Sequence, residues 1–333
     1  MTLQQETAPW LRNHDASTIY GREISLLVCQ VKEISLKFIL VFLFIYFFFF
    51  RWFEDFENMS TIHTTNIIPV DLNCILCAVE FSLSFLMKDV LKDPQKSNLF
   101  LTKAKTRRDA IHDVLWDEKR SIWSDYLIKE QKLNENFYAS AFFPLWMDNF
   151  DYTGSSLFGN ATRKRLAFQA FSDLGLFSFL GGLPASLIES GQQWDFPNAW
   201  APLQHVTVHG LDSNDRLTIT TPARKEAAKV LAQKFLKNAF ITWKETGFMF
   251  EKYNVTQLGK GDGGEYVTQT GFGWTNGVVL DFLNKYGDDV ESPYLPPLVS
   301  SSSSFKRRSL HPENVWFVFL LSYMALIFMF LGF

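Results

Sequence analysis

Apolar side chains recur at helical spacing in the middle of this 333-residue chain, and this periodicity limits the possible folds more than any other feature. The clearest segment opens with Thr221 and Pro222, which suit the N-cap and the first position of a helix. Apolar residues then follow at every fourth position: Ala227, Leu231, Phe235 and Ala239. Gly247 suits the C-terminal stop, because glycine readily adopts a left-handed conformation. The pattern predicts one helix from Pro222 to about residue 246.

Three further segments have helical spacing, at residues 71–83, 102–116 and 275–285. Strand-like alternation is scarce, and the best short candidate is Gln204–Gly210. The expected helices start roughly 30–40 residues apart, a spacing typical of paired helices in a solenoid or toroid. The sequence therefore predicts an all-α fold, although no repeated motif marks the pairs.

Charge and cysteine content argue against two classes of protein. The net charge is −3 and no dense cluster of Lys and Arg occurs, so we expect no nucleic-acid partner. Three cysteines are too few for a disulfide framework. Cys74 and Cys77 form a C-x-x-C motif, but no second pair of Cys or His at zinc spacing accompanies them. We expect both to be core residues of the apolar run in which they lie.

Two apolar segments flank the helical region. Residues 36–50 are short for a membrane span. Residues 315–333 have spanning length and no charge, and they follow small residues at 300–304 and a polar spacer. That order is typical of a glycosylphosphatidylinositol attachment signal, and a transmembrane anchor explains it equally well. Three N-glycosylation sequons agree with the secretory route: Asn58, Asn160 and Asn254. The sequence therefore predicts membrane attachment, with the folded part on the extracellular side.

Two loops between the expected helices carry side chains suited to a ligand. Ser190–Gln204 combines Trp, Gln, Asp, Asn and Pro, and it fits either a rigid turn or a sugar-binding loop. Gly247–Gly277 contains Glu251 and Glu265 in aromatic surroundings, separated by a glycine-rich segment. We expect these glycines to allow close approach to a ligand and closure over it. A carboxylate in such a pocket is suited to act as a base, whereas a flexible surface loop would leave both glutamates exposed.

The same two loops resemble a known family. GQQWDFPNAWAPLQ, at residues 191–204, is similar to the second signature of the trehalases, inverting glycoside hydrolases that split α,α-trehalose into two glucoses. EKYNV and GDGGEYVTQTGFGWTNGVVL, within residues 251–280, resemble the C-terminal catalytic region of that family. Further segments match in the same order: Arg51–Phe53, Ile67–Asn73, Val114–Tyr126 and Leu183–Trp200. The resemblance runs from Arg51 to about Asp288.

The resemblance implies an (α/α)6 toroid with the sugar site in its central funnel. It implies trehalose as the substrate, and neither a metal nor a cofactor. Inversion requires a general acid and a general base about 6.5–9.5 Å apart, so that a water fits between the base and the sugar. On the motif match, Glu251 takes the position of the base and Glu265 that of a sugar contact. Gln193, Trp194 and Asp195 are expected to shape the pocket.

The chain departs from the family before Arg51. A motif like SGWDFSSRWF supplies the general acid in the family, whereas here RWF follows IYFFFF and Phe47 holds the position of the acid. Phenylalanine cannot donate a proton, so the acid half of the mechanism is expected to be missing. The N-terminal half of the family, with its first signature, has no match either. We therefore expect the matched part to form about the second half of a toroid.

The sequence divides into four expected segments. These are an unmatched segment 1–50, the helical catalytic domain 51–290, a Ser-rich linker 291–314 and the hydrophobic anchor 315–333. The phenylalanine run in the first segment fits translated intron sequence, since a pyrimidine-rich tract encodes Phe, and it also fits a membrane helix. Two functions stay open: the C-terminal portion of a membrane-attached trehalase, or a catalytically inactive trehalase-like protein. For the chain as it stands, loss of the acid predicts no measurable hydrolysis.

Overall fold

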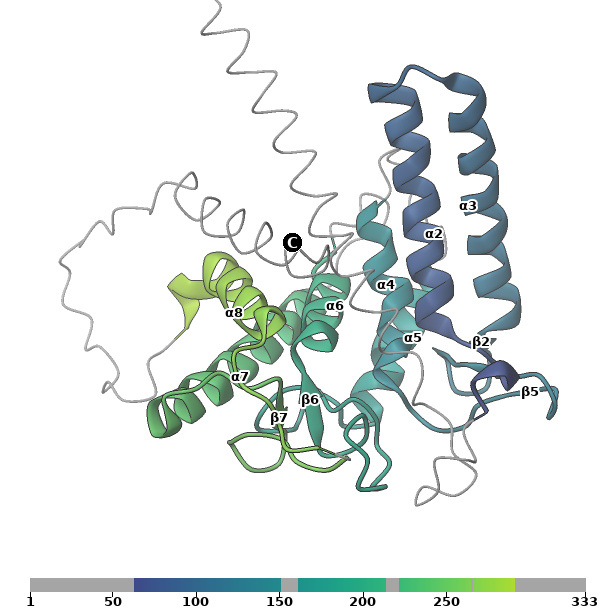
Figure 1. The fold of residues 1–333 in the computed structure, drawn as a ribbon. Helices are drawn as coiled ribbons and strands as arrows, with labels where there is room; N and C mark the ends of the chain where they lie inside the picture. Colours follow the sequence, from purple (N-terminus) through teal and green to yellow (C-terminus); the bar gives the residue numbers. More distant parts are fainter. Residues whose placement is uncertain (1–62, 151–160, 214–221, 265, 291–333) are drawn as a thin grey trace, which may run out of the picture. The chain divides into compact units, whose positions relative to one another are not determined.

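Helices dominate the part of the chain that the computed structural model describes, residues 63–150, 161–213, 222–264 and 266–290 (Figure 1). The α-helices are α2 (Val70–Phe85), α3 (Pro94–Val114), α4 (Phe143–Met147), α5 (Ala161–Asp173), α6 (Ala201–Leu211), α7 (Pro222–Thr246) and α8 (Gly273–Tyr286). Short 3-10 turns lie at Thr64–Asn66, Ala139–Phe142, Asp148–Phe150 and Gly287–Asp289, and a π turn lies at Leu86–Val90. The predicted all-α class is confirmed for these residues.

The strands of the described residues are short and pair in three antiparallel groups. They are β1 (Ile67–Ile68), β2 (Trp116–Asp117), β3 (Ile122–Trp123), β4 (Tyr126–Leu127), β5 (Lys132–Leu133), β6 (Asn198–Trp200) and β7 (Lys252–Asn254). β4 lies between β1 and β5, β2 pairs with β3, and β6 pairs with β7. The ribbons therefore join loops between helices, and they form no layer of their own.

The helices α2 and α3 pack along each other, and α2 also contacts α4 (Figure 1). Cys74 and Cys77 are fully buried in α2, and Cys77 Sγ donates a hydrogen bond to Ala104 O of α3 at 3.3 Å. Both thiols are free, so the prediction that they are core residues is confirmed. Within the described residues, the segment Val70–Val90 is the one helix long and apolar enough to cross a membrane by length and composition. Its buried cysteines contribute to the protein core instead.

The helix α3 starts earlier than the predicted segment 102–116. Asp93 caps it, since Asp93 Oδ1 accepts a hydrogen bond from Lys96 N at 3.0 Å, and Pro94 occupies the first turn. In the first two turns only Ser97 is buried. Apolar periodicity cannot mark such a start, because almost no side chain there faces the core.

The helices α6, α7 and α8 pack against one another, and α6 also contacts α4. The predicted long helix is confirmed as α7, with Leu231, Phe235 and Ala239 buried along it. Gly247 follows α7 with φ of +78°, the left-handed conformation expected of a C-terminal stop. The predicted segment 275–285 lies within α8.

The predicted strand at Gln204–Gly210 is wrong, because these residues lie in α6. Pro202 occupies the first turn of this helix. Nearly every side chain of α6 is buried, since three helices surround it, so burial follows no period along the segment. The Val and Thr residues favour a strand intrinsically, and tertiary packing overrides that preference.

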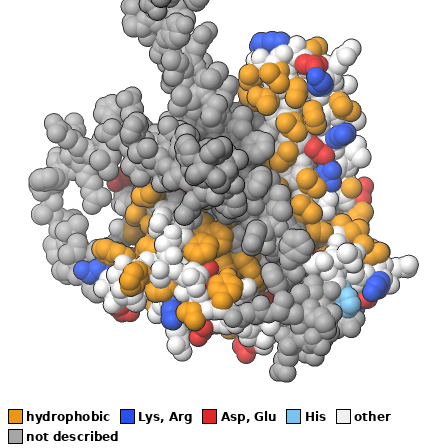
Figure 2. All heavy atoms as spheres, viewed as in Figure 1, with side chains coloured by type: hydrophobic (Ala, Val, Ile, Leu, Met, Phe, Trp, Pro, Cys, Tyr) orange, Lys and Arg blue, Asp and Glu red, His pale blue; other side chains and the backbone are white. Residues whose placement is uncertain are grey.

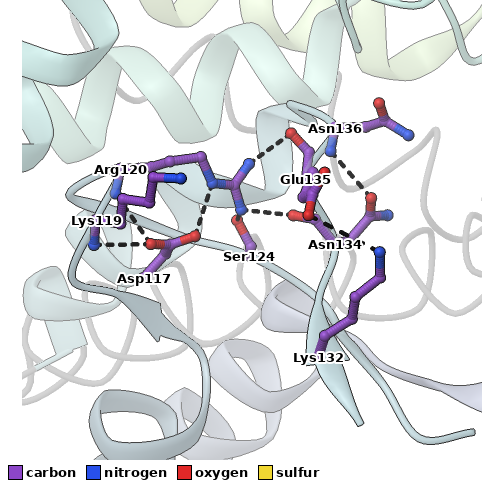
Figure 3. Close-up of polar contacts among 8 residues, drawn as sticks. All are labelled: Asp117, Lys119, Arg120, Ser124, Lys132, Asn134, Glu135 and Asn136. Carbon is purple, nitrogen blue, oxygen red and sulfur yellow. Dashed lines mark hydrogen bonds and ion pairs between the residues drawn. The ribbon is translucent and has the colours of Figure 1, made fainter. Parts of the chain in front are cut away.

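Arg120 closes the turn between β2 and β3 and ties it to the next loop (Figure 3). Its guanidinium donates to Asp117 Oδ2 at 2.7 Å and to Ser124 Oγ at 2.8 Å. It also donates to the carbonyl oxygens of Asn134 and Glu135, each at 2.6 Å. One side chain thus satisfies four acceptors in a region with almost no regular structure, so Arg120 holds this region together.

Apolar side chains also reach the surface of several helices. Figure 2 shows them along the pair formed by α2 and α3. The large exposed ones on and beside these and other helices include Leu76, Leu91, Leu99, Val114, Phe240, Trp243, Leu280 and Leu283.

Candidate active site

The ribbon formed by β6 and β7 joins the two loops that the sequence singled out (Figure 1). In its register Asn198 pairs with Asn254, and Trp200 pairs with Lys252. Trp200 is the last residue before α6 in the segment Ser190–Gln204, whose part before α6 is called the tryptophan-rich loop below, and Lys252 directly follows Glu251. The ribbon therefore places the candidate base next to the aromatic loop.

Glu251 is buried, with 1% of its surface exposed. Its backbone is fixed on both sides: Glu251 N donates to Gln269 O at 3.0 Å, and Glu251 O accepts from Trp274 Nε1 at 3.1 Å. Neither carboxylate oxygen makes a hydrogen bond of ordinary geometry to a described residue. A buried carboxylate without such partners is costly for folding, and this cost is typical of groups kept for chemistry.

Burial raises the pKa of Glu251 above its ordinary value. The Gln269 backbone N–H, the positive charge of Lys252 and the Tyr266 hydroxyl act on the carboxylate and oppose this increase without cancelling it. Burial, and then the negative charge of Glu251, in turn raise the pKa of Tyr266 to about 12. A carboxylate with a raised pKa accepts a proton more readily, so Glu251 is suited to act as a base.

Lys252 is fully buried and holds in place the glycine-rich loop that lies between Glu251 and Glu265. Its Nζ donates to Gly263 O at 2.7 Å and to Asp262 O at 3.2 Å, and it lies 5.6 Å from the ring centroid of Trp200. Burial lowers its pKa to about 8, against the opposing effects of Glu251 and Asp262. The ammonium group therefore connects the loop, the aromatic cluster and the candidate base. The resemblance did not single out this residue.

Three tryptophans pack together, and one of them, Trp274, donates a hydrogen bond to the backbone oxygen of Glu251. Trp194 and Trp200 stack with centroids 3.6 Å apart and an interplanar angle of 9°. Trp274 meets Trp200 edge-on at 5.8 Å. Indole faces of this kind suit the apolar face of a sugar ring. Only Trp194 was predicted as a site residue. Trp200 and Trp274 lay within the matched motifs, but their packing depends on the ribbon and could not be inferred from spacing.

Asp195 fixes the shape of the tryptophan-rich loop. It is 6% exposed, and its two carboxylate oxygens accept hydrogen bonds from Ser186 Oγ at 2.6 Å and Ser190 Oγ at 2.5 Å. Gln193 lies beside it, and Gln193 O accepts a hydrogen bond from Trp200 Nε1 at 2.9 Å. The Oε1 atom of Gln193 is buried and has no hydrogen-bond partner among the described residues. An amide oxygen of this kind has the capacity to accept a hydrogen bond from a hydroxyl group.

Two glycines let the glycine-rich loop approach the tryptophan-rich loop. Gly263 and Gly264 both have φ of +83°. A Cβ at Gly263 would lie 2.5 Å from Gly191 O, and one at Gly264 would lie 2.7 Å from Gln193 Cβ. The sequence predicted close approach to a ligand. In the structure these glycines approach another loop of the same chain, which makes them part of the wall of the site.

Several predicted features fall outside the described residues. Glu265 and Phe47 are among them, so the expected sugar contact and the expected loss of the acid stay predictions. The same holds for the hydrophobic run 36–50 and for the linker and anchor, 291–333. The other four of the five predicted site residues are described, and they lie on the two loops that the ribbon of β6 and β7 joins: Glu251, Gln193, Trp194 and Asp195.

Comparison with known proteins supports a family assignment. The Trehalase family profile matches residues 44–287. The trehalases of Arabidopsis thaliana and Homo sapiens are each 38% identical to the chain over 71% of its length, and the match covers 37% and 38% of those proteins. The chain thus spans well under half the length of these relatives. The solved structure of neutral trehalase Nth1 from Saccharomyces cerevisiae superimposes with a TM-score of 0.51 at 24% identity, covering 66% of the chain and 38% of that structure. This last likeness confirms the predicted helical toroid type of fold.

Proposed function

Because the chain belongs to the trehalase family, we propose that its helical domain carries the base half of an inverting trehalose hydrolase. The observation that carries this proposal is the environment of Glu251. Its side chain is buried, its backbone oxygen accepts a hydrogen bond from the Trp274 indole, and both carboxylate oxygens lack a hydrogen-bond partner of ordinary geometry among the described residues. A base that must bind a water and face a sugar needs this combination of exclusion from solvent and free acceptor atoms.

In this mechanism Glu251 takes a proton from a water, and the water oxygen attacks the anomeric carbon. A general acid on the opposite face protonates the glycosidic oxygen as the bond between carbon and oxygen breaks, so the configuration inverts. Trp194 and Gln193 would contact the sugar, the buried Trp200 would support Trp194 by stacking, and Asp195 and Lys252 would fix the loops that carry the site. Glu251 must be ionised to act, so activity depends on a pH above its raised pKa.

For the chain as it stands, we propose binding of trehalose without hydrolysis. Phe47 occupies the acid position in the motif match, and loss of a general acid costs about 10²–10⁴-fold in rate. We therefore propose that this chain is a catalytically inactive trehalase-like protein, and that a form containing the general acid would hydrolyse trehalose.

Glucose release and trehalose binding test both readings. The full chain should release no glucose above background, and trehalose should change the tryptophan fluorescence of the full chain while sucrose should not. A fusion that supplies the first half of a complete family member should hydrolyse trehalose, and Glu251→Gln in that fusion should abolish hydrolysis. A fusion that remains active with Glu251→Gln would exclude Glu251 as the base. Hydrolysis by the unmodified chain at the rate of the fusion would exclude the inactive reading.

We also propose that residues 315–333 attach the protein to a membrane, with the helical domain outside the cell. The charge-free segment of spanning length supports this, and the three sequons agree with it. Cells that express the chain distinguish the two forms of attachment. Release by a phosphatidylinositol-specific phospholipase C identifies a lipid anchor, and resistance to both the phospholipase and alkaline carbonate identifies a transmembrane helix. Recovery in the soluble fraction without treatment would contradict membrane attachment.

A further inference from the structure

Two histidines and one aspartate meet between α6 and α8. His205 and His209 are four residues apart on α6, and Asp281 lies on α8. His209 Nε2 is 2.7 Å from Asp281 Oδ2, and His205 Nε2 is 3.5 Å from the same oxygen. One ligand atom of each side chain lies within 4.8 Å of the other two. This is a cluster of three metal-ligating groups, separate from the residues that surround Glu251.

The helical conformation of Gln204–Gly210 is what brings the two imidazoles together. Residues four apart on a helix lie on one face, about 5–6 Å apart at Cβ. In the strand that the sequence predicted, the same residues would be about 13 Å apart, at about 3.3 Å per residue. The imidazole centroids are 4.2 Å apart, and the packing of α8 against α6 adds the carboxylate.

The spacing of the three groups fits a tetrahedral transition metal. Bonds of 2.0–2.1 Å to Zn²⁺ separate two tetrahedral ligand atoms by about 3.3–3.4 Å. The two observed distances to Asp281 Oδ2, 2.7 Å and 3.5 Å, lie on either side of that value. The side chains of His209 and Asp281 are 25% and 31% exposed, so an ion reaches the cluster from solvent and a water can fill the fourth position.

His205 has no well-formed hydrogen bond within the cluster. It is 8% exposed, and its Nδ1 is buried without a hydrogen-bond partner among the described residues. Its Nε2 faces the oxygen that His209 already occupies at hydrogen-bond distance. A buried imidazole with no well-formed hydrogen bond is unfavourable unless another interaction compensates for its lost hydration.

We propose that His205, His209 and Asp281 bind a divalent transition-metal ion of the Zn²⁺ type. Two imidazoles and one carboxylate select Zn²⁺, Co²⁺ or Ni²⁺ over Mg²⁺, which prefers oxygen ligands. The neighbouring Lys285 does not oppose the ion strongly, because its ammonium is paired with Asp212 at 2.6 Å. The bound ion replaces the hydrogen bond between His209 and Asp281 with a bond to all three side chains.

The ion would join the two helices that carry the indoles of the candidate active site. α6 begins directly after Trp200, and Trp274 lies in the first turn of α8. At 1.5 Å per residue the three side chains lie about 7–14 Å along the helices from these tryptophans. The ion therefore stabilises the packing of α6 on α8 from behind the site and takes no part in hydrolysis.

Metal binding by the full chain tests the proposal directly. Competition with a chromophoric chelator should show one tightly bound Zn²⁺ per chain, and Mg²⁺ in excess should not displace it. Co²⁺ should give visible d–d absorption typical of four-coordinate nitrogen and oxygen ligands, and Zn²⁺ should raise the melting temperature. This experiment needs no variant, so failure to bind Zn²⁺ and the absence of a Co²⁺ spectrum would overturn the proposal whatever the variants do.

Variants assign the binding to these side chains. His209→Gln and Asp281→Asn change partly exposed residues, and each should weaken Zn²⁺ binding at least about tenfold, since even outer-shell changes cost that much. Each should also remove the rise in melting temperature with Zn²⁺. His63→Gln changes a histidine outside the cluster and should leave both readouts unchanged. Equal Zn²⁺ affinity in the unmodified chain and in a folded His209→Gln or Asp281→Asn variant would overturn the proposal, as would a loss of binding in His63→Gln alone.

Discussion

Replacement of Lys252 by methionine should remove an increase of stability with pH, which is the opposite of the pH dependence that a salt-bridged lysine contributes. Lys252 is fully buried, and burial lowers its pKa from 10.5 to about 8. The unfolded chain therefore binds more protons than the folded chain between about pH 8 and pH 10.5. Because stability rises with pH wherever the unfolded state binds more protons, the free energy of unfolding should increase through this window.

The magnitude follows from the difference between the two pKa values. A difference of about 2.5 pH units at 1.36 kcal/mol per unit gives at most about 3 kcal/mol, gained as the pH rises from below 8 to above 10.5. The tyrosines oppose this at the upper end, since burial raises the pKa of Tyr253 and Tyr266 to about 12. Their contribution decreases stability only above about pH 10, and both forms of the protein share it.

At pH 7 the methionine variant should be less stable, despite the cost of keeping an ammonium buried. Gly263 O and Asp262 O would lose their donor, and a buried carbonyl without a partner costs about 1–3 kcal/mol. The apolar methionine recovers part of this, as replacements of buried charges often do. We therefore expect a net loss of about 1–2 kcal/mol at pH 7 that grows as the pH rises to 10.5.

Urea unfolding of the full chain and of Lys252→Met, followed by circular dichroism from pH 7 to 10.5, measures this difference. The quantity of interest is the free energy of unfolding of the unmodified chain minus that of the variant. It should increase between pH 8 and 10.5. A difference that stays constant with pH would show that the lysine ionises normally in the folded protein, and would refute the reasoning.

Three further substitutions test other parts of the structure. In the unmodified chain the free energy of unfolding should decrease as the pH rises from about 4.5 through the raised pKa of Glu251, because the folded state holds a proton there that the unfolded state has lost. Glu251→Gln should remove this decrease. Equal profiles of the free energy of unfolding against pH in the two proteins would contradict this. Gly264→Ala should destabilise the chain by about 1–3 kcal/mol in urea unfolding, because φ of +83° and the contact with Gln193 both oppose a Cβ. Gly277→Ala is the matched control, since a Cβ there would meet nothing within 4 Å. Equal effects of the two substitutions would argue against the close approach of the two loops. Arg120→Lys should cost about 2–4 kcal/mol in the same assay, because an ammonium cannot reach the four acceptors of the guanidinium. A loss below about 0.5 kcal/mol, which is typical of an exposed ion pair, would show that stability does not depend on this network.

Local signals in the sequence determined the long helices and the family. The helix α7 could be predicted because its N-cap, its proline, its four-residue apolar repeat and its glycine stop all lie within one segment. The matched motifs pointed to Glu251 and to the loop of Gln193, Trp194 and Asp195 for the same reason, since each motif is continuous in sequence. The start of α3 carries a local signal, Asp93 before Pro94, but no apolar period follows it in the first two turns, whose side chains are mostly exposed.

Tertiary structure alone decided the features that depend on contacts between distant segments. α6 is a helix although its Val and Thr residues favour a strand, because α4, α7 and α8 surround it and leave no exposed face to set a period. The low pKa of Lys252 arises from its burial in the ribbon of β6 and β7, and Trp274 reaches Trp200 from α8. The cluster of His205, His209 and Asp281 requires both the helical form of α6 and its packing on α8. Sequence spacing reports what a residue does within its own turn or strand, whereas burial and long-range contacts set the pKa values and the neighbours on which a site depends.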